Sequence, residues 1–404
     1  MRLIRYVFIL ISTLLCQELQ HFSSVINIEV PVRVYSADNF VDDLTIDDFE
    51  IYDDGILQKT EAVYLIKKTK IERKEERSQF IPKTFRSFYL FFQIFDYNTK
   101  IKGALSYFIE NLLQPSDELT IVTPLKTYVL KKESFEKISK SEMLRQLHEI
   151  IRRDILIGTS EYRSTIEEMK GVTKTLIKAI TMDSTIDNTV SSAWIYADWN
   201  SVNDQLTRYS MFREKLETLG GIDVQNLLNF AKAIKFKDGQ KHVFLFYQRE
   251  LIPRIEPSMA NLLYSLNQAE PGTVLDAMRL FESQTNPLLF SPDVLKKAYS
   301  ESSITIHFLF FTPPRESVPG IYFEERSDDV FAPFMEMAKA TGGTTQSSAN
   351  PEFLFRKASE AVETYYLLYY APKNYKPDAK YHELKVKVKK PGFTITHRAG
   401  YFAN

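Results

Sequence analysis

The chain has 404 residues, of which 44% are hydrophobic and 25% are charged, so it is long enough for two domains or for one large one. Its 51 basic and 52 acidic residues give a formal net charge of -1, and this balance argues against nucleic acid or an anionic membrane surface as a partner. The single cysteine, Cys16, excludes disulfides and a thiolate metal site from the folded part.

The first residues have the pattern of a secretory signal peptide. Arg2 and Arg5 precede an apolar run at residues 6–15, which is too short to span a bilayer. We therefore expect residues 1–24 to be a signal peptide and the mature chain to be exported, either periplasmic or secreted, with no transmembrane segment. Cys16 follows the apolar run and leaves a lipid anchor at this position open as an alternative.

Residues 25–68 predict a small β segment. Val30, Val32 and Val34 alternate with other residues, as in a half-buried strand, and Asp54-Gly55 is a hairpin signal because both positions require positive φ. Residues 364–404 contain three further strand patterns. Neither segment has enough strands to bury a core alone, so we expect them to form one β-sandwich together.

Residues 69–82 are mixed in charge and have no apolar stripe, which predicts a solvated linker. Residues 83–363 then alternate between strand and helix patterns, as parallel sheets do. The run at 87–95 is almost entirely apolar, which indicates a strand buried on both faces, and residues 127–130 indicate an edge strand. The predicted fold class is therefore α/β, with a doubly wound, mostly parallel sheet inserted into the β-sandwich.

Residues 181–221 interrupt the strand–helix pattern. They are polar and contain both tryptophans, Trp194 and Trp199, which predicts a long loop or a helical insertion. A large apolar side chain in an insertion either anchors a partner or packs the insertion onto the body. The sequence leaves both interpretations open.

A candidate binding crevice follows from the fold class, because ligands of doubly wound sheets bind outside the carboxyl ends of the strands. Asp96 ends the first buried strand, and a polar turn follows it. Another polar stretch follows the strand at 242–247, where Arg249 and Glu250 either line the crevice or form an ion pair at its rim. The candidate binding residues are Asp96, Asn98, Lys100, Thr159, Gln248, Arg249 and Glu250.

Several segments occur in an order and spacing that are specific when taken together. They are VPVRVYSADNFVDDLTIDDFEIYDDGILQKTEAV near the start, KDGQKHVFLFYQRE in the middle, MAKATGGTT later, and YYLLYYAP with VKVKKPGFTITHRAGYF at the end. In these segments the chain resembles the bacterial, Acidobacteria-type VWFA-related domain proteins. The resemblance implies a signal peptide, a von Willebrand factor A-like (Rossmann-like) domain and flanking β segments.

Domains that are similar in this way often carry a metal-ion-dependent adhesion site (MIDAS), with a D-x-S-x-S turn, a threonine and a further aspartate as ligands. Here Asp96 is retained, Asn98 offers an amide oxygen and Thr159 corresponds to the threonine. Lys100 replaces the second serine. The repulsion between its cation and a divalent ion about 4 Å away is about 8 kcal/mol at an effective dielectric of about 20. We therefore expect a degenerate MIDAS-like crevice without metal or other cofactor, in which Lys100 either pairs with Asp96 or is solvated.

No catalytic motif stands out. The sequence has no nucleophile elbow, phosphate-binding loop, dinucleotide-binding glycine motif or H-E-x-x-H pattern, and His242 and His307 lie in predicted strands, where we expect structural roles. We therefore predict a non-enzymatic module that binds an unidentified protein at the crevice, with the insertion as a second candidate surface. Two alternatives stay open: a magnesium-dependent adhesion domain with unusual ligands, and a structural or assembly protein of the cell envelope.

Overall fold

The computed structural model describes residues 26–37, 39–130, 132–183, 193–220, 223–248, 251–258, 261, 292–311, 316–325, 328–348, 350–373 and 375–403. The predicted signal peptide with Cys16, and the candidate residues Arg249 and Glu250, lie outside these ranges. Within the ranges, no helix is both long enough and apolar enough to cross a membrane.

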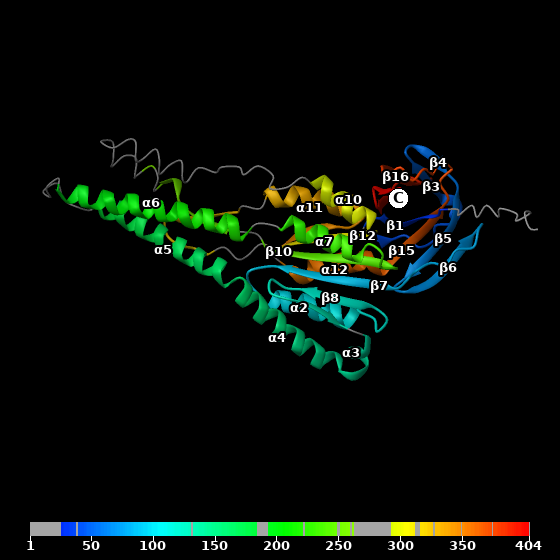
Figure 1. Ribbon diagram of the computed structural model, residues 1–404, viewed down its shortest axis with the longest axis horizontal. Helices are drawn as coiled ribbons and strands as arrows, with labels where there is room; N and C mark the ends of the chain where they lie inside the picture. The colour runs from blue at the N-terminus through cyan, green and yellow to red at the C-terminus, as the bar shows by residue number, and fades with distance from the viewer. Residues whose placement is uncertain are drawn as a thin grey trace, which may run out of the picture.

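The chain folds as a mixed α/β structure with several sheets (Figure 1). The central sheet has six strands in the order β14-β12-β10-β7-β8-β9. These strands are β7 (Arg86–Gln93), β8 (Glu118–Val122), β9 (Thr127–Leu130), β10 (Gln240–Gln248), β12 (Ile304–Phe311) and β14 (Thr345–Ser348). Neighbouring strands are parallel except β8 and β9, which confirms the predicted edge strand at 127–130.

Helices cover both faces of the central sheet because alternate residues of each strand point to opposite sides. Phe88, Leu90 and Phe92 share one core with four helical elements, and Tyr89 belongs to the core on the other face. The first set is α2 (Thr99–Tyr107), the π-helical turn η2 (Phe108–Leu112), α4 (Lys140–Gly158) and α12 (Pro351–Glu363). The second set is α7 (Val224–Ile234), α10 (Pro292–Glu301) and α11 (Asp328–Ala340). A short helix, α3 (Lys132–Lys137), precedes α4.

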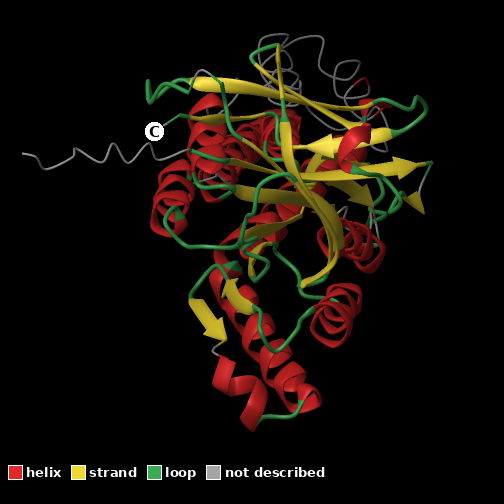
Figure 2. Ribbon diagram, turned by 90° about the vertical axis from the view of Figure 1, so that its right-hand side faces the viewer, coloured by secondary structure: helices red, strands yellow, loops and turns green. Residues whose placement is uncertain are grey.

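The N- and C-terminal segments share two further sheets, which we call the terminal sheets; Figure 2 looks onto them. One has the order β17-β1-β15-β5-β6, with β2 beside β1, and the other has the order β18-β16-β3-β4. The N-terminal elements are β1 (Ile28–Ser36), β2 (Asn39–Phe40), the 3-10 turn η1 (Ile46–Asp48), β3 (Phe49–Asp53), β4 (Ile56–Gln58), β5 (Thr60–Lys67) and β6 (Lys70–Glu76). The C-terminal strands are β15 (Thr364–Tyr370), β16 (Tyr381–Val388), β17 (Thr394–His397) and β18 (Gly400–Phe402).

One buried core joins the two terminal sheets. Val32 of β1, Ile51 of β3 and Val386 of β16 all belong to it. Tyr370 and Tyr401 donate hydrogen bonds to the buried carboxylate of Asp53 at 2.8 and 2.9 Å, so a polar group is satisfied inside this core. Strands from the two ends of the chain therefore depend on each other for burial.

The predicted linker is wrong in its middle part. Lys70–Glu76 form β6, which pairs antiparallel with β5 at the edge of a terminal sheet. Tyr64 of β5 donates a hydrogen bond to Glu76 at 2.6 Å. An edge strand has one free side and is often densely charged, which discourages pairing with other chains. The composition that suggested a linker is that of a charged edge strand.

In the part of the region around residues 181–221 that the structure describes, α5 (Ser160–Asp183) and α6 (Ala193–Leu219) form a helical arm. Figure 1 shows the arm extending away from the terminal sheets. Its base packs on a two-stranded sheet of β11 (Leu251–Ile255) and β13 (Ile321–Glu325), and Tyr209 donates a hydrogen bond to the Pro253 carbonyl at 2.9 Å. The helical alternative is confirmed for Ala193–Leu219, while the side chains of Trp194 and Trp199 lie outside the described part.

Candidate functional site

The loop after β7 is held in place by Gln248, the last residue of β10. The Gln248 Oε1 accepts hydrogen bonds from the backbone N–H groups of Phe95 and Asp96 at 2.9 and 3.0 Å. The Gln248 side chain is buried. Because two backbone N–H groups of the loop donate to this one buried oxygen, Gln248 fixes the position of the loop.

Thr159 reaches the same loop from the junction of α4 and α5. Its hydroxyl donates to the Ile155 carbonyl at 2.7 Å and lies 3.4 Å from the Phe95 carbonyl. The Phe95 ring stacks on Tyr162 of α5, with 3.7 Å between the ring centroids. The structure therefore brings together Asp96, Thr159 and Gln248, at the base of the helical arm.

Asn98 and Lys100 lie at the start of α2. The Asn98 Oδ1 accepts hydrogen bonds from the backbone N–H groups of Lys100 and Ile101, both at 3.1 Å. This is the N-cap arrangement that asparagine commonly adopts. Asp96 and the Lys100 side chain are both exposed, and an ion pair between them stays a prediction.

The candidate metal ligands do not fit a hard divalent cation. Magnesium requires near-octahedral oxygen ligands, some of which are supplied by the protein. Asn98 already uses its amide oxygen as a helix cap, and Thr159 is buried. Of the three candidates Asp96, Asn98 and Thr159, Asp96 alone is exposed, and a single carboxylate is a weak ligand set.

A groove of about 830 Å³ lies beside this loop, between Tyr97–Thr99 and helix α4. Its lining carries the cationic residues Lys102, Arg152 and Arg153 and one acidic residue, Glu149. All four side chains are exposed. Sequence reasoning missed the groove because Lys102 and the arginines are far apart in the chain and only the packing of α4 brings them together.

His148 lies in this groove and is held on both ring nitrogens. The Tyr97 hydroxyl lies 2.5 Å from its Nδ1, and the Ser106 hydroxyl lies 3.1 Å from its Nε2. Burial, and then the nearby Lys102, lower the pKa of His148 to about 4, so the ring is neutral near pH 7. Burial raises the pKa of Tyr97. The pair forms a neutral, fixed wall of the groove.

His242 and His307 lie inside the central sheet, away from the crevice. They occupy neighbouring strands and are 1% and 0% exposed. His307 stacks on Phe244, and its Nδ1 lies 3.0 Å from the Thr344 hydroxyl. Burial lowers the pKa of both rings, that of His307 to about 3.

Within the described part of the chain, one group has the residue types of a metal site, namely Asp53, Asp54 and His382. The Asp53 carboxylate already accepts from two tyrosines. Asp54 accepts from the Glu383 N–H and contacts the His382 Nδ1, both at 2.9 Å. Through these contacts the group connects the end of β3 to β16, which is a structural role.

No family model and no curated protein matches this chain. A comparison with solved structures finds the human COPII-coat protein Sec24c, which is 8% identical, with a TM-score of 0.27 over 81% of this chain and 44% of that chain. The chain thus spans less than half the length of that protein. A likeness at this TM-score carries no argument about fold or function.

Proposed function

We propose that the chain is an exported, non-enzymatic protein-interaction module with a doubly wound, von Willebrand A-like central sheet. The strand order, the parallel neighbours and the helices on both faces support this interpretation of the fold. The crevice at the carboxyl ends of β7 and β10 is the proposed contact surface, with the helical arm as a second candidate surface.

One observation carries this proposal, namely the way in which three separate elements converge on the loop after β7. Gln248 and the α4–α5 junction hold the loop, Asn98 caps the helix that follows, and Asp96 stays exposed beside the groove. A fixed backbone that presents exposed charge is what recognition requires, because little ordering entropy is then lost on binding.

The proposed crevice acts without a bound metal. The amide oxygens of Gln248 and Asn98 accept backbone N–H groups, and Lys100 follows Asn98 at the first turn of α2. Partner recognition then depends on direct contacts between side chains.

The charge of the groove indicates the chemistry of the partner. Arg153 is paired with Asp154 at 3.1 Å. This leaves Lys102 and Arg152 against the acidic Glu149, and Ile157 is 56% exposed at the same groove. Complementary charge steers association and an apolar contact contributes affinity. We therefore propose that the partner presents an acidic segment with an apolar residue.

Panning a displayed peptide library on the purified chain tests this proposal. We expect acidic peptides with an apolar anchor to be enriched, and we expect Arg152→Glu to lower their affinity about tenfold or more. Lys385→Glu is the matched control, since Lys385 is exposed on β16 of a terminal sheet. Selected peptides whose affinity is unchanged by Arg152→Glu, or whose binding requires Mg²⁺, would contradict the proposal.

A further inference from the structure

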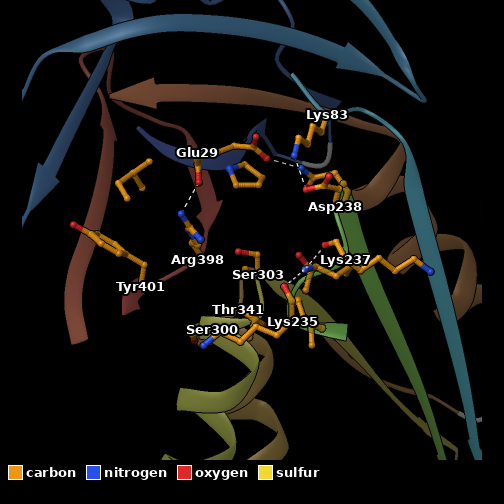
Figure 3. Close-up of a pocket in the computed structure, with 18 of the residues that line it drawn as sticks. Glu29, Lys83, Lys235, Lys237, Asp238, Ser300, Ser303, Thr341, Arg398 and Tyr401 are labelled. Atoms are coloured by element: carbon orange, nitrogen blue, oxygen red, sulfur yellow. Dashed lines mark hydrogen bonds and ion pairs between the residues drawn. The ribbon is translucent and has the colours of Figure 1, made fainter. Parts of the chain in front are cut away.

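A second cavity, of about 500 Å³, lies at the opposite end of the central sheet, and we call it the junction cavity. Its lining comes from β1, from the loop between α7 and β10, from the start of β12, and from residues 398–402. Figure 3 shows Ser303 opposite Glu29 in this cavity. The cavity therefore lies where the terminal sheets meet the central sheet.

The lining of the junction cavity is strongly cationic. Six basic side chains line it against two acidic ones, Glu29 and Asp238. The basic residues are Arg33, Lys83, Lys235, Lys237, Lys241 and Arg398. The chain as a whole is almost neutral, so this excess is local and creates a positive potential inside a partly enclosed space.

Three of these cations donate hydrogen bonds to backbone carbonyls and form no ion pair with a carboxylate within the described ranges. Arg33 donates to the carbonyls of Ala361 and Gly342, the latter at 3.0 Å. Arg398 donates to the Glu29 carbonyl at 2.6 Å, and Lys241 donates to three carbonyls at the end of α7. Carbonyls satisfy the N–H groups but leave the net charge in place.

Acidic side chains balance only part of this charge, and Lys237 is the lining cation that pairs with Glu118 outside the cavity. The Glu29 carboxylate accepts from the Gln240 amide at 2.7 Å and from the Tyr369 hydroxyl at 2.6 Å, both neutral donors. Asp238 pairs with Lys83 at 2.5 Å. Enclosing a cation without an opposite charge carries a large desolvation cost, which a bound anion would offset.

Polar atoms at the junction cavity also lack partners. Among the described residues, the Ser300 Oγ and the Arg398 Nε find no hydrogen-bond partner, and Ser300 is 5% exposed. A buried donor without an acceptor is unfavourable. Both groups can donate to an oxyanion, which offers several acceptors at once.

From this geometry we propose that the junction cavity binds a small organic anion of the phosphate-ester class. Arginine, lysine and hydroxyl groups are the donors that phosphate oxygens accept from. The volume suits a small molecule larger than phosphate itself. Phe236, which is 91% exposed, lines the same cavity and offers a contact for the organic part.

Calorimetric titration of the purified chain with inorganic phosphate, glycerol phosphate and glycerol tests this proposal. We expect saturable heat with glycerol phosphate, weaker binding of phosphate and none of glycerol. Lys235→Gln and Ser303→Gly should each weaken glycerol phosphate binding about tenfold. Ser303→Gly removes the hydroxyl without backbone strain, since Ser303 has a φ of 51°. The matched control Lys385→Gln, which removes an exposed charge from β16, should leave binding unchanged.

The proposal is overturned if neither anion gives heat up to about 10 mM, if glycerol binds as well as its phosphate, or if both cavity variants bind like the wild type. Binding that disappears at physiological salt would also overturn it, because it would reflect surface charge attraction alone. The crevice plays no part in this experiment, so Arg152→Glu should leave glycerol phosphate binding intact, and the two proposals can fail separately.

Discussion

Charged side chains are exposed at one end of the central sheet and buried at the other. At the carboxyl end, Asp96, Lys102 and Arg152 are exposed to solvent. At the amino end, Arg33 and Lys241 are each 3% exposed and are bonded to carbonyls. Exposed charges lose little hydration free energy and can steer a partner. Enclosed charges have a large desolvation penalty, which an opposite charge must offset. Substitutions at the amino end should therefore affect folding, and those at the carboxyl end should affect binding.

The largest expected effect concerns the buried ion pair at the amino end. Arg86 and Asp117 are fully buried and pair at 2.6 Å. Asp117→Ala leaves the guanidinium without its counter-charge, so we expect a loss of about 4 kcal/mol in the free energy of unfolding. Urea denaturation measures it.

The double variant Arg86→Met with Asp117→Leu serves as the control for this experiment. It removes both charges together, so we expect it to recover most of the lost stability. Equal destabilisation by the single and the double variant would show that packing, and not charge, determines stability at this end of the sheet.

The next effect is a dependence on pH. The folded-state pKa of His307 is about 3, below the value of about 6.5 expected in the unfolded chain. The stabilisation is therefore complete above pH ~6.5 and is lost as pH falls from there toward the folded-state pKa. We expect His307→Gln to reduce the slope of unfolding free energy against pH by about 1.4 kcal/mol per pH unit. Urea titrations between pH ~6.5 and ~5 measure this slope, and identical slopes would contradict the expectation.

A smaller effect is expected at the carboxyl end for Gln248→Leu. The substitution keeps the side chain buried but removes the acceptor for the N–H groups of Phe95 and Asp96. Two unsatisfied donors beside solvent should cost about 1–2 kcal/mol. Hydrogen exchange at these two amides should speed up while exchange in β12 stays unchanged, and protection that persists would argue for another acceptor.

The smallest effect on stability is expected for Asp96→Ala, within about 0.5 kcal/mol, because Asp96 is exposed. Its affinity for the selected acidic peptides should nevertheless rise if the crevice is the contact surface, because the substitution removes a like charge beside the groove. Titration of both proteins with Mg²⁺ and Mn²⁺ should give no heat. Metal binding that is lost in Asp96→Ala would restore the magnesium-dependent alternative, and unchanged peptide binding would favour a structural role in the envelope.

The sequence predicted the features that depend on local periodicity. The apolar run at 87–95 indicated a strand with both faces buried, and the polar residues after it indicated a loop at the carboxyl end. The meeting of Asp96 with Gln248 followed from the fold, because parallel strands end at the same edge, whereas Thr159 was expected there from the family resemblance. The sequence could not show that the amide oxygens of Asn98 and Gln248 accept hydrogen bonds from backbone N–H groups.

The features that sequence reasoning missed depend on contacts between distant segments. Arg33, Lys241 and Arg398 have no shared motif, and only the meeting of the terminal sheets with the amino end of the central sheet places them around one cavity. The strand β6 was missed because period-two hydrophobicity marks strands that bury one face, and this edge strand is almost entirely exposed.

The position of β1 has a consequence for the order of events during synthesis. This strand lies between β15 and β17, which leave the ribosome only after all the strands of the central sheet. Except for the short β2, β1 has no hydrogen-bonding neighbour in the terminal sheets until β15, which begins at Thr364, has been made. A chain that stops before residue 364 would therefore expose the apolar edge of β1, which is a site for aggregation or chaperone binding.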